Sequence, residues 1–202
     1  MSRLLLVRHG DTKLDNAIRF WGITDVELNA KGIRQAERLR DRLATEKINA
    51  AYASNLSRAR VTAETIASRH RLDITTRDEL NEINFGFLEG LTFEEISQRH
   101  PEMAEVLSRW AIKPKFPGGE SLDELDNRVQ KFLKILQKHQ PEETILIVSH
   151  AGTLRLMICN LMGMGPERWR HMQLDLASLS IIETYPQGAI LSLLNDISHL
   201  KS

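Results

Sequence analysis

The sequence predicts an α/β protein: a three-layer αβα sandwich with a mostly parallel central sheet and a small helical lid insertion. Short aliphatic runs of strand length alternate with amphipathic stretches of helical spacing, a pattern typical of helices packed on both faces of a sheet. The chain has 202 residues, so we expect one domain over 1–202 with a lid-like excursion at about 79–121. Apolar residues make up 42%, enough for a core that needs no disulfides or metals.

The first part of the chain alternates strands and helices. Asn29 is a suitable N-cap for the first helix, in which apolar Ile33, Ala36 and Leu39 recur at helical spacing. Strands are marked instead by short runs rich in aliphatic residues. The expected elements are a strand at 2–7, a helix at 29–43, a strand at 49–53, a helix at 56–68 and a short strand at 72–75.

The second part begins with the excursion, in which glycines and prolines concentrate. Ser121 followed three residues later by Glu124 is a capping box, which predicts the start of a long helix. A hairpin is expected to close the sheet at the end of the chain. The expected elements are short helices at 92–98 and 102–110, a long helix at 121–138, a strand at 144–148, a helix at 153–161 and hairpin strands at 179–184 and 189–194.

Charge and composition argue against several classes of protein. The 27 basic and 27 acidic residues cancel, which argues against a nucleic-acid binder and against a basic membrane-surface protein. The aliphatic runs are too short for a membrane span or a signal peptide, and one cysteine, Cys159, allows no internal disulfide. The cytoplasm is therefore the expected compartment. The oligomeric state stays open, with a homodimer as one option.

Two predicted strands end in the same way. The run 4–7 leads into Arg8, His9 and a glycine, and the run 145–148 leads into Ser149, His150 and a glycine two residues later. In open α/β sheets, ligands bind in the crevice at the carboxyl ends of the strands. A lone histidine after a strand is usually an ordinary hydrogen-bonded side chain, but two matched turns indicate a shared site if the strands are neighbours.

Arginines near these turns indicate an anionic ligand. Arg58 and Arg60 follow the second strand on a helix, and Arg8 precedes His9. The planar guanidinium pairs with phosphate oxygens, and neutral imidazole is a nucleophile at pH 7. Attack on a phosphoryl group would form phosphohistidine, with arginines in place of a metal. The sequence contains no spacing typical of a zinc site and no glycine-rich nucleotide loop, so no metal and no cofactor are predicted.

The sequence resembles the histidine phosphatase superfamily, also called the phosphoglycerate mutase-like family. The resemblance covers nearly the whole chain, and the order and spacing of its motifs are more specific than any one of them. The motifs are Leu6-Val7-Arg8-His9-Gly10-Asp11-Thr12, Arg19-Phe20-Trp21-Gly22, Ser54-Asn55-Leu56-Ser57-Arg58-Ala59, Asn81-Glu82-Ile83-Asn84-Phe85-Gly86, Pro117-Gly118-Gly119-Glu120-Ser121 and Ser149-His150-Ala151-Gly152.

The resemblance implies a role for each catalytic candidate. His9 is implied to be the nucleophile that becomes phosphorylated. Arg8, Arg58 and His150 are implied to form the phosphate pocket, with His150 protonated when the anion is bound. Glu82 is implied to be the general acid that protonates the leaving alkoxide, and then the base that activates water.

The resemblance also implies the substrate-binding residues, with one departure. Asn16, Gly22 and Gly152 are expected to contact the substrate. Many family members carry asparagine six residues after the nucleophile, where this chain has Asp15. A carboxylate facing a phosphate would repel it, so we expect Asp15 to point away and Asn16 to substitute.

The compact chain and the run at 85–92 resemble the phosphatase branch of the family. The implied function is a metal-independent hydrolase of small-molecule phosphomonoesters that works through phosphohistidine. The nearest resemblance is to α-ribazole phosphatases of cobalamin synthesis and to related broad-specificity phosphatases. The alternatives are a phosphoglycerate mutase-type isomerase and a non-catalytic phosphate-binding protein. Phe87, Trp110 and Phe116 are candidates to stack on a substrate ring, against the commoner alternative of ordinary packing.

Overall fold

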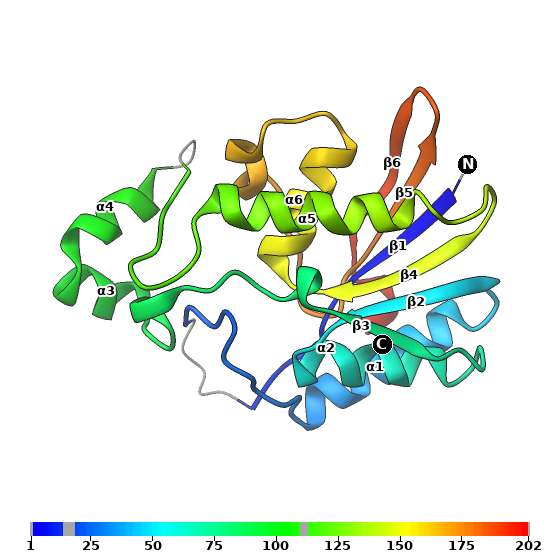
Figure 1. Cartoon of the computed structure of the whole chain (residues 1–202). Helices are drawn as coiled ribbons and strands as arrows, with labels where there is room; N and C mark the ends of the chain where they lie inside the picture. Colours follow the sequence, from blue (N-terminus) through cyan, green and yellow to red (C-terminus); the bar gives the residue numbers. More distant parts are fainter. Residues whose placement is uncertain (1, 14–18, 110–112, 202) are drawn as a thin grey trace.

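A six-stranded sheet forms the centre of the molecule in the computed structural model, which describes residues 2–13, 19–109 and 113–201 (Figure 1). The short aliphatic runs of the sequence form its strands. These are β1 (Ser2–Arg8), β2 (Ile48–Ser54), β3 (Ile74–Arg77), β4 (Thr144–Ser149), β5 (Leu179–Tyr185) and β6 (Gly188–Asp196).

The strand order is β3-β2-β4-β1-β5-β6. Strands β3, β2, β4 and β1 pair in parallel, whereas β5 is antiparallel to β1 and to β6. The sheet is therefore mostly parallel, as predicted, and the closing hairpin is present. Parallel pairing places the carboxyl ends of β1, β2 and β4 at one edge of the sheet, where their following loops meet.

Helices cover both faces of the sheet, which confirms the three-layer prediction (Figure 1). Alternate residues of β1 point into different cores: Leu5 and Val7 join the apolar cluster on one face, and Leu4 and Leu6 join the cluster on the other. No helix in the described part of the chain is long and apolar enough to cross a bilayer. The covering helices are α1 (Ala30–Leu43) and α2 (Ser57–Ala67) on the first face, and α5 (Leu122–Leu136) and α6 (Ala151–Leu161) on the second.

The expected excursion leaves the sheet after β3 and returns at α5, and its two helices lie away from the sheet in Figure 1. Capping boxes begin α3 at Thr92 and α5 at Ser121, the second as predicted. Leu88, within the excursion, is fully buried in the main core. The elements of the excursion are the 3-10 turns η1 (Asp78–Leu80) and η2 (Gly86–Leu88), followed by the helices α3 (Phe93–Arg99) and α4 (Pro101–Ser108).

Three details of the sequence prediction were wrong. Helix α6 begins at Ala151 rather than at 153. Strand β3 begins at Ile74 rather than at 72, because a turn with Arg71 at a positive φ of 54° precedes it. Ile33 is 38% exposed, and Gly32 is buried on the core side of α1 instead. A side chain at Gly32 would meet the backbone oxygen of Asp11 at 2.0 Å, so only glycine lets the helix approach the loop after β1.

Candidate active site

His9 and His150 follow the adjacent strands β1 and β4. The strands pair in parallel with Arg8 opposite Ser149, so the next residue of each chain segment emerges at the same place. The two ring centroids are 5.0 Å apart, with the ring planes tilted by 56°. His9 is 7% exposed and His150 is fully buried. The expectation that the two strands are neighbours, with both histidines at one point, is confirmed.

The hydrogen bonds of His9 indicate which ring nitrogen is free to react. Its Nδ1 lies 2.7 Å from the backbone oxygen of Gly10. A carbonyl oxygen only accepts hydrogen bonds, so we infer that Nδ1 carries the proton and that Nε2 keeps its lone pair. The backbone of His9 is held by Ser149 and Ala177, each through a bond of 3.0 Å. This arrangement leaves Nε2 with a free lone pair, which a nucleophilic nitrogen would need.

His150 belongs to a chain of hydrogen bonds that also keeps it neutral. Arg58 Nε donates to His150 Nδ1 at 3.2 Å, so the ring proton is on Nε2. That nitrogen donates to Ser54 Oγ at 2.8 Å, and the Ser54 hydroxyl donates to Asn81 Oδ1 at 2.7 Å. Each group in the chain therefore has one defined orientation.

Burial lowers the pKa of His9 and of His150 well below the usual histidine range. The positive charges of Arg8 and Arg58 act in the same direction on both rings. Both imidazoles are therefore neutral at pH 7 in this arrangement, as a nucleophile at His9 requires. A phosphate anion between them would counteract these effects, so protonation of His150 on binding is compatible with its neutral state here.

The pH dependence of stability tests this arrangement. Histidine in an unfolded chain has a pKa of ~6.5, so below that pH the unfolded chain binds protons that the native state does not. The free energy of unfolding is therefore expected to fall as the pH drops from 7 to 5.5, by up to about 1.4 kcal/mol per pH unit for each buried histidine. Urea unfolding at several pH values measures the slope, and His9→Ala should reduce it. Parallel curves for the wild type and this variant would contradict a neutral, buried His9.

Two arginines flank the histidines. Arg58 is 2% exposed and lies in the first turn of α2, where its Nη1 donates to Thr24 O at 2.8 Å and its Nη2 donates to Gly22 O at 2.6 Å. Arg8 Nη1 donates to Leu174 O at 2.6 Å, whereas its buried Nε has no hydrogen-bond partner in the described part of the chain. An anion in the site could satisfy this donor.

Glu82 lies at the amino end of α6. Its Oε2 accepts from Gly152 N at 3.1 Å, and its Oε1 accepts from Thr153 N at 3.2 Å and from Ile83 N at 3.1 Å. The side chain is 8% exposed. The free N–H groups at this helix end hold the carboxyl group of Glu82 in place. Helix α6 thus holds Glu82 beside the two arginines, whose pKa values its charge raises against the effect of burial.

Gly152 makes this contact possible, and replacing it should disturb Glu82 specifically. A Cβ at Gly152 would lie 2.6 Å from Glu82 Oε1. We expect Gly152→Ala to displace the carboxylate and to lower kcat/KM on alkyl phosphates by about 10- to 100-fold. The helix itself should not suffer, because alanine is the better helix former. Steady-state phosphate release measures the loss.

A glycine elsewhere provides the control for this variant. Gly163 has a φ of 66°, and no heavy atom of the described residues outside the adjoining backbone lies within 4 Å of the place that a Cβ would take there. Gly163→Ala should therefore cost about 1 kcal/mol of stability through backbone strain and leave activity unchanged. Full activity in Gly152→Ala would show that the position of Glu82 does not depend on Gly152.

Gly22 connects the site to the excursion. Its N–H donates to Glu89 Oε2 at 3.1 Å, and the same carboxylate accepts from the backbone of Thr24 and of Phe85. A Cβ at Gly22 would lie 1.9 Å from the backbone oxygen of Ile83. Sequence reasoning did not single out Glu89, because only the folded loop shows how many N–H groups converge on it. Asn16 and Asp15, the other predicted contacts, lie outside the described residues.

One further sequence expectation was wrong. Arg60 is exposed and pairs with Glu64 at 2.9 Å, so it does not belong to the basic cluster of the site. It lies two residues after Arg58 on a helix and therefore points elsewhere. Phe116 is 1% exposed and packs edge-on against Phe85, with ring centroids 4.9 Å apart, so it is a core residue, as the commoner alternative for these aromatic residues predicts. Trp110 lies outside the described residues.

Arg155 is a candidate that sequence reasoning missed. It follows Gly152 by three positions on α6 and therefore shares its helix face. Its Nε is buried without a hydrogen-bond partner among the described residues. Burial lowers the pKa of Arg155, and the charge of Glu82 opposes that effect. The signal that could have identified Arg155 is its spacing of three residues from Gly152, the glycine that follows His150.

Comparison with known proteins agrees with this geometry. The family model described as "Histidine phosphatase superfamily (branch 1)" matches residues 4–197. The chain belongs to the histidine phosphatase superfamily. Its resemblance to that family in sequence is thereby confirmed, and so is the expected fold class.

Relatives within the histidine phosphatase superfamily indicate the branch. Phosphoserine phosphatase 1 of Hydrogenobacter thermophilus is 33% identical over 99% of this chain and 95% of its own length. The adenosylcobalamin/alpha-ribazole phosphatase of Escherichia coli is 34% identical over 96% and 95%. The crystal structure of the alpha-ribazole phosphatase from Shigella flexneri superposes with a TM-score of 0.87, at 33% identity and 96% coverage of both chains. These similarities support a phosphatase over a mutase.

Proposed function

We propose that the protein is a metal-independent phosphomonoester hydrolase that forms a phosphohistidine on His9. The observation that carries the proposal is the hydrogen bond from His9 Nδ1 to Gly10 O, which leaves Nε2 unprotonated. The His9 ring lies next to the His150 ring, with 5.0 Å between the ring centroids. The guanidinium groups of Arg8 and Arg58 supply the positive charge that a phosphoryl dianion requires. Membership of the histidine phosphatase superfamily supports the same reaction.

The first step transfers the phosphoryl group to the enzyme. His9 Nε2 attacks phosphorus, the new N–P bond forms, and the P–O bond to the alcohol breaks. Glu82 gives its proton to the departing alkoxide. Arg8 and Arg58 stabilise the charge on the phosphoryl oxygens, and their hydrogen bonds to backbone oxygens hold them in place before substrate arrives.

The second step returns the enzyme to its starting state. Glu82, now a carboxylate, takes a proton from water, and the resulting hydroxide attacks phosphorus while the N–P bond breaks. The products are the free alcohol and inorganic phosphate, and Glu82 again carries its proton. A bisphosphate primer has no place in this scheme. Steady release of phosphate from simple aryl phosphates without primer tests the scheme, and a strict primer requirement would favour the mutase.

We propose that the segment 79–121 acts as a lid and selects the organic part of the substrate. A cavity of about 360 Å³ is lined in part by Glu82, Asn84 and Ile23, next to the proposed acid. Of the aromatic candidates named from the sequence, Phe87 is the exposed one among the described residues, at 71%. A small-molecule alcohol fits this space better than a macromolecule.

The proposed substrates are small phosphomonoesters, among them α-ribazole 5'-phosphate. Relatives named for alpha-ribazole phosphatase and for phosphoserine phosphatase both match nearly the full length of this chain. A phosphate-release screen should therefore include both esters, a nucleotide, a sugar phosphate and an aryl phosphate. Comparable rates on all of them would indicate broad specificity. Binding of phosphate esters with no turnover of any would favour the alternative of a non-catalytic binding protein.

Chelation is expected to leave activity unchanged. In the described ranges 2–13, 19–109 and 113–201, His, Cys, Asp and Glu side chains form no group of three or more that could hold a metal ion. The proposed scheme assigns charge stabilisation to arginines instead. Dialysis against EDTA followed by an assay with p-nitrophenyl phosphate measures this. A large loss that added divalent cations restore would contradict a metal-independent reaction.

A further inference from the structure

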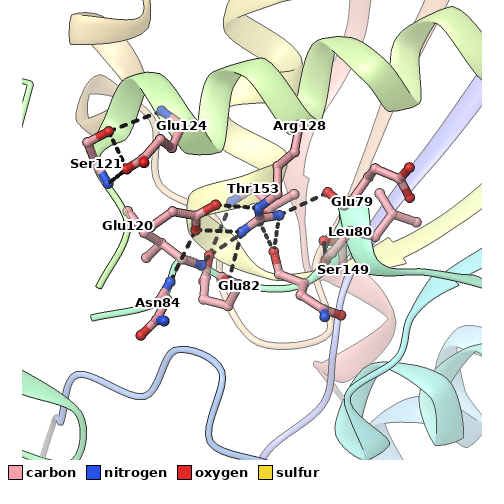
Figure 2. Close-up of polar contacts among 12 residues, drawn as sticks. Glu79, Leu80, Glu82, Asn84, Glu120, Ser121, Glu124, Arg128, Ser149 and Thr153 are labelled. Atoms are coloured by element: carbon pink, nitrogen blue, oxygen red, sulfur yellow. Dashed lines mark hydrogen bonds and ion pairs between the residues drawn. The ribbon is translucent and has the colours of Figure 1, made fainter. Parts of the chain in front are cut away.

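The backbone oxygens of residues 79–82, the segment that ends at Glu82, accept hydrogen bonds from several side chains. Arg128 Nη1 donates to Glu79 O at 2.9 Å and to Asn81 O at 2.7 Å, and its Nη2 donates to Glu82 O at 2.9 Å. Figure 2 shows the guanidinium of Arg128, which comes from α5, directed at this backbone. Beyond the turn η1, the segment lacks the ladder of a helix or strand, so side chains must satisfy these carbonyls.

Two hydroxyl groups also donate hydrogen bonds to the same backbone segment. Ser149 Oγ donates to Leu80 O at 2.6 Å, and Thr153 Oγ1 donates to Asn81 O at 2.6 Å (Figure 2). Each of the four carbonyls from 79 to 82 therefore accepts a hydrogen bond from a side chain. The donors come from α5, β4 and α6, so the segment is fixed against three elements of the fold.

Glu120 holds Arg128 in turn. Arg128 Nε and Nη2 donate to the two oxygens of the Glu120 carboxylate, at 2.7 and 3.0 Å, and the Asn84 N–H donates to the same carboxylate at 3.2 Å. Such a bidentate pair fixes the plane of the guanidinium. Both side chains of the pair are only 18% exposed. The pair also joins the loop after Glu82 to the start of α5.

Arg128 has no donor left for a substrate. A guanidinium has five N–H groups, and Arg128 directs two at Glu120, one each at Glu79, Asn81 and Glu82. An anion could bind Arg128 only by displacing one of these acceptors. This saturation distinguishes it from Arg8, whose Nε has no hydrogen-bond partner among the described residues.

We propose that Arg128 is a positioning residue for Glu82, an inference that rests on the proposed function. Arg128 and Glu120 fix the main chain of Glu82 on one side, and the N–H groups of Gly152 and Thr153 fix its carboxylate on the other. Arg128 does not touch the reacting atoms. Its effect on catalysis passes through the place of the Glu82 carboxylate, and small displacements of a catalytic group are costly.

The test compares substrates that differ only in their need for an acid. A p-nitrophenolate leaves without protonation, whereas an alkoxide requires it. For Arg128→Met we expect kcat/KM on an alkyl phosphate to fall about tenfold or more relative to p-nitrophenyl phosphate. Arg128→Lys should restore part of the ratio, since an ammonium keeps three of the donors. Arg60→Met, at an exposed arginine of α2, is the matched control and should leave the ratio unchanged.

A double variant separates positioning from general damage. In a Glu82→Gln background, Arg128→Met should add little to the dependence on leaving group, because the group that it positions is already gone. Equal losses on both substrates, or a full additional effect in the Glu82→Gln background, would overturn the proposal. If Arg128→Met does not fold, Glu120→Gln is measured in its place, because it weakens the paired hydrogen bonds that orient the Arg128 guanidinium.

The same data keep this proposal distinct from the proposed function. A wild-type protein that does not hydrolyse p-nitrophenyl phosphate would overturn both. A wild type that does, together with a leaving-group effect in Glu82→Gln and none in Arg128→Met or Glu120→Gln, would overturn the positioning role alone.

Discussion

His9→Ala is expected to abolish turnover while the fold stays intact. The imidazole supplies the only atom of the protein proposed to bond to phosphorus, so water would have to attack the ester directly in the variant. We expect a loss of ~10³-fold or more in kcat on every phosphomonoester, aryl or alkyl alike. The backbone of His9 bonds to Ser149 and Ala177 through its own N–H and C=O, which alanine retains. A phosphate-release assay tests the loss of turnover, and circular dichroism tests whether the fold stays intact.

His100→Ala is the matched control, because His100 lies between α3 and α4, outside the two strand–histidine turns. It should retain wild-type turnover. Quenching the wild type in alkaline detergent during turnover should also trap a phosphorylated protein that is labile in acid and stable in base, and His9→Ala should trap none. Substantial activity in a folded His9→Ala protein, or label on another residue, would refute the nucleophile assignment.

The sequence predicted those parts of the site that local patterns encode. The two histidines follow aliphatic strands, and the position of a strand end depends on a few consecutive residues. The layers followed from the alternation of strands and helices for the same reason. The ends of helices and strands were predicted less accurately. Strand β3, for example, begins at Ile74, because Arg71 has a left-handed conformation in the preceding turn.

Contacts between distant segments could not be predicted from these patterns. Glu82 is bonded to Gly152 and Thr153, about 70 positions later, and Arg128 reaches back 46 positions to the oxygen of Glu82. A helical arginine such as Arg128 is usually solvated, and no spacing distinguishes it from its neighbours before the chain folds. The resemblance to the family identified Glu82, but how it is held became apparent only in the structure.

Glu82→Gln is the second variant with a large expected effect. An amide cannot give a proton to an alkoxide, so kcat/KM on an alkyl phosphate should fall by about 10²- to 10⁴-fold. The loss on p-nitrophenyl phosphate should be far smaller, because that leaving group needs no proton. The quotient kcat/KM is the right measure, since it reports on the steps up to formation of phosphohistidine and ignores the second step. Glu79→Gln, three residues earlier in the same segment, is the matched control and should leave both values unchanged.

The second role proposed for Glu82 has its own signature in the same variant. Without a base to activate water, phosphohistidine formed from p-nitrophenyl phosphate should persist. A rapid release of p-nitrophenolate equal to the enzyme concentration should then precede slow turnover, and the phosphorylated protein should accumulate. Equal losses of kcat/KM on alkyl and aryl esters would remove the general-acid role, and the absence of such a burst would remove the role as base. The two functions of one carboxylate can therefore be separated, because they act on opposite sides of the same covalent intermediate.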